Sequence, residues 1–77
     1  MAIGYVLINT VAGKEHDVYI ELSKIKEIIE LIPLIGEYDI IAKIEADNFD
    51  GLSHIVFELI RSVPGITNTK TLTEIQF

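Results

Sequence analysis

The side chains that most often carry out catalysis or bind metal are few in this sequence of 77 residues. His16 and His54 are the only histidines, and there is no cysteine. Each histidine falls on a predicted helix among polar neighbours, and neither has a second histidine or a cysteine at the spacing of a metal site. Ser23 and Ser62 belong to no nucleophile elbow and no Ser–His–Asp pattern. We therefore expect surface histidines, no metal, no cofactor and no catalytic residue, and hence no enzyme.

Phosphate binding and acid–base catalysis have equally little support. The five glycines form neither a G-x-G-x-x-G sequence nor a P-loop. Glu27, Glu30 and Glu37 are scattered, as in a solvated rim, and are not spaced as a catalytic pair. Twelve acidic residues against six basic ones give a net charge of -6, whereas nucleic-acid binding draws its affinity from Lys and Arg that neutralise phosphates. The sequence therefore indicates a protein that does not bind nucleic acid directly.

Nothing in the sequence points to a membrane or to export. No basic region precedes the first apolar run, so no secretory signal is visible. Charged residues interrupt the apolar runs well short of the roughly 20 residues that a spanning helix needs. Because there is also no cysteine for a disulfide, we expect a cytoplasmic protein.

Hydrophobic periodicity predicts four strands and two helices. The strands, where β-branched residues run together or alternate with polar ones, are expected at 3–10, 28–35, 40–46 and 66–77. The helices, where apolar residues recur at helical spacing, are expected at 14–25 and 49–63. Asp47 or Asn48 precedes the second helix as an N-cap. Pro33 cannot donate a ladder hydrogen bond, so the second strand is expected at an edge of the sheet.

The order βαββαβ predicts an α+β, ferredoxin-like fold that occupies the whole chain, 1–77, as one domain. In that topology a four-stranded antiparallel sheet has the strand order 4-1-3-2, and two helices pack on one face. The other face is bare in a single copy, and we expect it to expose Tyr5, Leu7 or their neighbours, with Ile41 and Ile75. The chain is 49% hydrophobic, which is high for so small a domain. A second copy is expected to cover the bare face, which gives a dimeric α/β barrel-like assembly.

Short motifs follow one another through the second half of the chain. They are G-x-Y-D-x-x-x-K at Gly36, Tyr38, Asp39 and Lys43, a helix start at Asp47 and Leu52, P-G-I from Pro64, and T-x-T at Thr69 and Thr71. In this order and spacing they resemble the effector-binding domain of the Lrp/AsnC (feast/famine) transcription regulators. The opening IGYVLINTVAGKEHDVYIEL also resembles that family, so the resemblance covers essentially the whole chain. Full-length members carry an N-terminal helix-turn-helix domain, whereas this sequence starts in its first strand and resembles the stand-alone RAM-domain proteins.

The resemblance implies a site for a free amino acid between subunits. The ligand-binding residues carried onto this sequence are Gly36, Tyr38, Asp39, Thr69 and Thr71. Asp39 would pair with the ammonium of the ligand, while backbone N–H groups near Gly36 and the threonine hydroxyls would donate to its carboxylate. Each residue also has a purely structural explanation: Gly36 makes the turn, Asp39 caps it, Tyr38 packs, and threonines form strands well.

The resemblance further implies three kinds of partner: an amino-acid effector, other copies of the chain in a dimer or a ring of dimers, and a full-length Lrp/AsnC regulator. Binding would modulate assembly or that regulator. Two alternatives stay open. One is a small oxygenase- or isomerase-like enzyme of the dimeric α+β barrel group, which a cavity joining His16 or His54 with Tyr5 would favour. The other is a structural oligomerisation module or a regulatory subunit of the ACT type.

Overall fold

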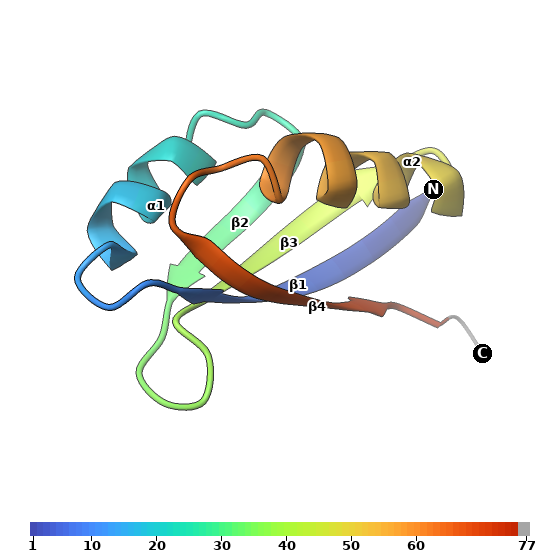
Figure 1. The fold of residues 1–77 in the computed structure, drawn as a ribbon. Coiled ribbons are helices and arrows are strands. Elements are labelled where there is room, and N and C mark those ends of the chain that lie inside the picture. Colours follow the sequence, from blue (N-terminus) through green and yellow to red (C-terminus); the bar gives the residue numbers. More distant parts are fainter. Residues whose placement is uncertain (76–77) are drawn as a thin grey trace.

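The computed structural model describes residues 1–75 and has the βαββαβ order that the sequence predicts (Figure 1). Its four-stranded antiparallel sheet has the order β2-β3-β1-β4, so the predicted strand order and the edge position of the second strand are confirmed. Both helical segments cover the same face of the sheet. Within residues 1–75, no helix has the length and apolar character to span a bilayer. The elements are β1 (Ala2–Thr10), α1 (Glu15–Leu22), β2 (Ile28–Pro33), β3 (Ile40–Ala46), α2 (Phe49–His54), the π-helix η1 (Ile55–Ile60) and β4 (Ile66–Thr73).

The second helical segment is not the uniform helix that the sequence predicts for 49–63. The α-helical part, α2, continues into the π-helix η1, which ends at Ile60. The Arg61 N–H donates to the Val56 carbonyl over 2.9 Å, a bond that reaches back five residues, as in a π-helix. This wider turn directs both Ile55 and Ile60 into the core, where they are 4% and 0% exposed.

The predicted ends of β1 and β3 are confirmed, whereas α1, β2 and β4 were predicted too long at their C-terminal ends. α1 ends at Leu22 because the Ile25 N–H turns back to the Leu22 carbonyl over 3.0 Å, three residues away. β2 ends at Pro33 because the next N–H, from Leu34, donates to the Asp39 carbonyl over 2.8 Å and closes the hairpin. β4 ends at Thr73, and the last two predicted strand positions, 76–77, lie outside the described residues.

The N-cap of α2 is Asn48, one of the two predicted candidates. Its side-chain oxygen accepts a hydrogen bond of 2.9 Å from the Gly51 N–H, which satisfies a donor that the first helical turn leaves free. We expect Asn48→Ala to lower the free energy of unfolding by about 1 kcal/mol, measured by urea titration. Asn48→Asp, which keeps the acceptor, is the matched control. Equal losses in both variants would contradict the assigned role of the side-chain oxygen.

The core lies between the two helical segments and the sheet. Val6 and Ile8 of β1 and Ala42 and Ile44 of β3 are fully buried there. The helical segments complete it with apolar side chains at Val18, Leu22, Leu52, Ile55, Val56 and Ile60. No polar or charged side chain within residues 1–75 is buried, so aliphatic packing alone fills the layer between helices and sheet.

The opposite face of the sheet carries no helix (Figure 1). Leu7 pairs with Ile41, and Ile41 pairs with Ile32, so three aliphatic side chains form a row across β1, β3 and β2. Tyr5 lies next to this row on β1 and pairs with Leu72 of β4. The predicted positions of Tyr5, Leu7 and Ile41 on the bare face are therefore confirmed.

Ile75 does not belong to that row. It is 71% exposed, and it follows the end of β4 at Thr73. The two threonines of the predicted site, Thr69 and Thr71, lie on the other face of the sheet. Thr69 and Thr71 are paired with Ile8 and Val6, whose side chains point into the core under the helices.

Candidate functional site

Asp39 ends the connection between β2 and β3 and fixes that connection to the end of β1. Its N–H donates to the Ile8 carbonyl over 2.9 Å. Its carboxylate oxygen Oδ2 accepts hydrogen bonds from the Thr10 N–H at 2.8 Å and from the Thr10 hydroxyl at 3.3 Å. Thr10 and Asp39 are 29 positions apart in the chain. The side chain of Asp39 therefore joins two distant segments and does more than cap its own turn. Within residues 1–75 the second oxygen, Oδ1, accepts no hydrogen bond.

Gly36 and Tyr38 lie in the same connection. Gly36 has φ = 141°, a conformation that favours glycine, and no atom lies within 4 Å of the position of an added Cβ. The turn therefore explains Gly36, and its backbone stays accessible. Tyr38 is half-buried. The Asn9 amide donates to the Glu37 carbonyl over 2.9 Å, which ties this loop to β1.

A pocket of about 370 Å³ lies between this hairpin and α1. Most of its surface is apolar, and the carboxylates of Asp39 and Glu15 are its acidic groups. An apolar pocket with a few convergent polar groups is the usual form of a small-molecule site. The carboxylates suit a cationic group, and the walls suit an apolar body. The lining residues are Glu15, His16, Tyr19, Pro33, Leu34, Asp39 and Ile40.

The contribution of α1 to this pocket was missed at the level of the sequence, where His16 was interpreted as a surface residue. His16 is exposed, but it also lines the pocket. Tyr5 is not beside it, because its hydroxyl donates to Glu74 over 3.0 Å and its ring lies near Lys43 on the bare face. The cavity that the enzyme alternative requires, with a histidine beside Tyr5, is thus not formed by these residues.

The two threonines of the predicted site lie elsewhere in the molecule. Thr69 and Thr71 line a groove of about 250 Å³ between β4 and the α2–η1 segment. Asp39 does not line this groove, and neither threonine lines the pocket beside Asp39. The structure thus brings Gly36, Tyr38 and Asp39 together in one loop and separates them from the threonines. A single ligand could touch both groups only if two copies of the chain contributed to its site.

Metal chemistry has no visible basis in the part of the chain that the structure describes. No group of three or more His, Cys, Asp or Glu side chains lies close enough to hold a metal ion there. The acidic groups of the pocket are two, Asp39 and Glu15, and Asp39 already accepts two hydrogen bonds from Thr10.

The structure is thus a ferredoxin-like domain with one bare sheet face and a pocket beside its central hairpin. The sequence profile of the Lrp/AsnC ligand binding domain matches residues 4–76. The chain belongs to this family.

Individual relatives agree with the family assignment. The chain is 34% identical over 70 residues to the HTH-type transcriptional regulator FL11 of Pyrococcus horikoshii; the match covers 91% of this chain and 46% of that protein. The crystal structure of FFRP-DM1 superposes with a TM-score of 0.91 and 37% identity, covering 97% of this chain and all of that one.

A more distant structure shares the fold. The transcriptional regulator NMB0573 of Neisseria meningitidis, solved as a complex with L-Met, has a TM-score of 0.82 at 16% identity and matches 97% of this chain and 50% of its own. The chain thus spans about half the length of regulators such as FL11 and NMB0573.

Proposed function

We propose that the chain is an amino-acid-binding regulatory domain that works as a homo-oligomer. Binding of a free amino acid modulates its assembly or a partner transcription regulator. The observation that carries the proposal is the position of Asp39, a carboxylate held in place at the edge of an apolar pocket. Equilibrium dialysis with radiolabelled amino acids tests it: saturable binding of one or a few of them is expected, and no retention of any would refute it.

The chemistry of the pocket suits the ammonium end of an amino acid. Thr10 holds Oδ2 of Asp39 with two hydrogen bonds, which leaves Oδ1 to accept from the ligand. The Glu15 carboxylate adds negative charge on the α1 side. Charge-assisted hydrogen bonds of this kind are about twice as strong as neutral ones. Leu34 and Ile40 form apolar walls of the same pocket.

The bare sheet face supports the homo-oligomer. Its aliphatic row, Leu7, Ile41 and Ile32, borders Tyr5 and Leu72, and Ile32 and Leu72 are 45% and 48% exposed. Contiguous apolar surface on a small domain marks an interaction site. A second copy that presents the same face buries both rows in one isologous interface.

The separation of Asp39 from Thr69 and Thr71 fits a ligand that lies between copies. A ligand bound across an interface favours the assembled state, because only that state offers the complete set of contacts. The effector would thereby change the population of oligomers or the affinity for a partner. A transcription regulator of the same family is the partner that we propose, since curated relatives such as FL11 are regulators of about twice this length.

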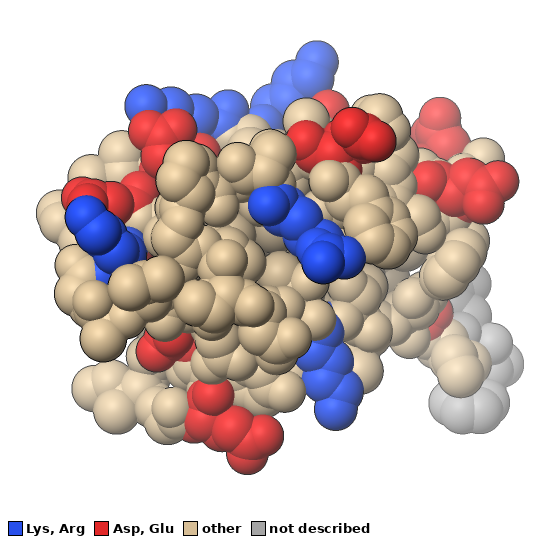
Figure 2. Space-filling model, in the orientation of Figure 1, with Lys and Arg blue, Asp and Glu red and all other residues tan. Residues whose placement is uncertain are grey.

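Direct DNA binding is not part of the proposed function. The net charge is -6, and on the face shown in Figure 2 the basic side chains are spread among acidic and uncharged ones. In a fluorescence-anisotropy titration at physiological salt, we expect no saturable binding of duplex DNA. A submicromolar dissociation constant would contradict this expectation.

A further inference from the structure

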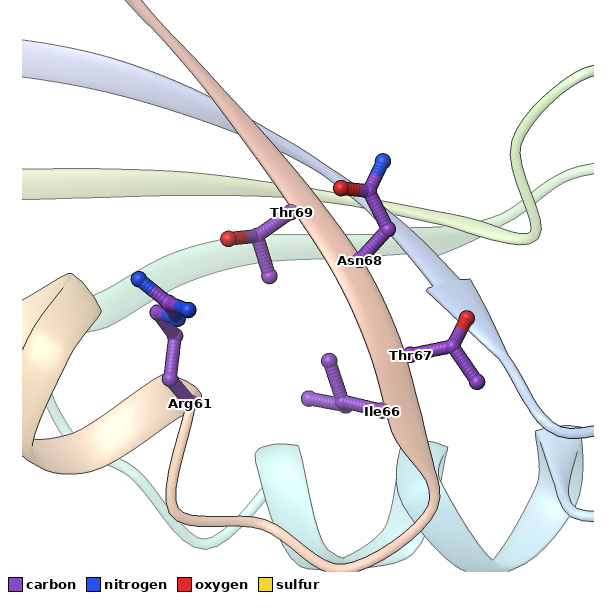
Figure 3. Close-up of a pocket in the computed structure, with 5 residues that line it drawn as sticks. All are labelled: Arg61, Ile66, Thr67, Asn68 and Thr69. Atoms are coloured by element: carbon purple, nitrogen blue, oxygen red, sulfur yellow. The ribbon is translucent and has the colours of Figure 1, made fainter.

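Arg61 stands at a small hollow between the end of η1 and the start of β4. The hollow has a volume of about 200 Å³ and is lined by Arg61 and by residues 66–69. Figure 3 shows the side chains of Arg61, Thr69 and Ile66 directed into the hollow, whereas those of Thr67 and Asn68 point away from Arg61. The guanidinium of Arg61 and the hydroxyl of Thr69 therefore face the same hollow, beside the aliphatic side chain of Ile66.

The guanidinium of Arg61 is positioned but is not paired with an acid. Its central carbon lies 5.2 Å from the centroid of the Phe57 ring, a cation–π arrangement that holds the planar group in place. The ion pairs found within residues 1–75 join Lys14 to Asp17 and Lys24 to Glu21. Arg61 is in neither of these ion pairs, so the N–H groups of its guanidinium can donate to a carboxylate from outside the chain.

The main chain of β4 adds donors on the same side. Among the strands of residues 1–75, β4 lies at an edge of the sheet and pairs with β1 alone, and an edge strand presents unpaired N–H groups on its outer side. A carboxylate in the hollow would lie near the guanidinium of Arg61, the hydroxyl of Thr69 and the main-chain N–H groups at the edge of β4. Among residues 1–75, no acidic side chain that would repel it lines the hollow or the adjoining groove.

The adjoining groove is apolar where it passes α2 and η1. It shares Arg61 and Thr69 with the hollow and continues along Phe49, Val56 and Phe57. Phe49 and Phe57 are 62% and 61% exposed, an unusual state for two aromatic rings in a domain of this size. The two cavities thus form one site with a cationic end and an apolar end.

We propose that Arg61, with Thr69, binds the carboxylate of an effector whose side chain is apolar and lies against Phe49 and Val56. The inference rests on the proposed amino-acid-binding function and narrows it to apolar amino acids. It also assigns the two charges of the zwitterion to different places: the carboxylate to Arg61 in the groove, and the ammonium to Asp39 in the pocket of a neighbouring copy.

Isothermal titration of L-leucine, L-leucinamide and 4-methylpentanoate tests the assignment. Leucinamide lacks the carboxylate, and 4-methylpentanoate lacks the ammonium. We expect Arg61→Gln to lower the affinity for leucine and for 4-methylpentanoate by at least about 10-fold, because a hydrogen bond to a charged group is lost. The weaker binding of leucinamide should be unchanged. Lys26→Gln, which removes the same charge from the exposed connection between α1 and β2, is the matched control and should bind leucine as the wild type does.

The outcomes separate this inference from the proposed function. If Arg61→Gln binds leucine with wild-type affinity, or if only polar amino acids bind the wild type, the inference is wrong and the proposed function stands. If the wild type binds no amino acid, the proposed function is wrong. In that case binding of 4-methylpentanoate that depends on Arg61 would still support a carboxylate site, and its absence would overturn the site as well.

Discussion

Asp39→Asn is expected to lower the affinity for the effector amino acid by roughly 10- to 100-fold, because it removes the charge that pairs with the ligand ammonium. The asparagine side-chain oxygen can still accept the hydrogen bond from the Thr10 N–H that Oδ2 of Asp39 accepts at 2.8 Å. The hairpin should therefore keep its connection to β1. Isothermal titration with the effector measures the affinity, and thermal unfolding without ligand checks that the fold is unchanged.

Asparagine is a better probe than alanine at this position. Asp39→Ala would leave the Thr10 N–H without its partner, and this group is partly buried, so lost stability would be confused with lost binding. Asp47→Asn is the matched control, since Asp47 is exposed in the bend before α2 and the charge change is the same. Wild-type affinity in Asp39→Asn would show that the carboxylate serves only to join the hairpin to β1.

Ile41→Glu is expected to convert the oligomer into smaller species, down to the monomer. Ile41 is at the centre of the bare sheet face, between Leu7 and Ile32, so two copies packed face to face would bury the new carboxylate near its counterpart. An unpaired buried charge costs several kcal/mol, which is enough to shift a micromolar association beyond measurable concentrations. Size-exclusion chromatography with light scattering gives the mass of each variant.

Ile20→Glu is the control for this change. Ile20 is 42% exposed on α1, on the helical side of the molecule, so the same substitution should leave the mass unchanged. Circular dichroism should show folded protein in both variants, because neither side chain belongs to the buried core. A wild-type monomer, or an Ile41→Glu oligomer of wild-type mass, would contradict the sheet-to-sheet interface.

The fold could be predicted because its determinants are local in the sequence. Alternation and helical spacing identify each element, and Pro33 independently places β2 at the edge. The π-helical turn of η1 was missed because Ile55, Val56 and Ile60 also fit the stripe of an ordinary amphipathic helix. Only the packing of this segment on the sheet decides between an α-helical and a π-helical turn. Strand ends were missed for a similar reason, since the bond from Leu34 to Asp39 that ends β2 depends on the hairpin as a whole.

The candidate site was predictable only in part. Gly36, Tyr38 and Asp39 are neighbours in the sequence, and they share one loop in the structure. The hydrogen bond from Thr10 to Asp39 joins residues 29 positions apart, and no local sequence pattern predicts it. Arg61 was not singled out because a lone basic residue after a helix looks like an ordinary surface group. Its significance comes from Thr69, which only the packing of η1 against β4 brings beside it.

The central claim is that a free amino acid binds the native protein and changes its assembly. A thermal-shift screen of all twenty amino acids, read together with light scattering, tests this most directly, since a ligand that binds only the folded state raises its stability by mass action. We predict stabilisation by one or a few amino acids with a change in the mass of the oligomer. Unchanged unfolding temperature and mass with every amino acid would contradict the claim and leave the domain as an oligomerisation module.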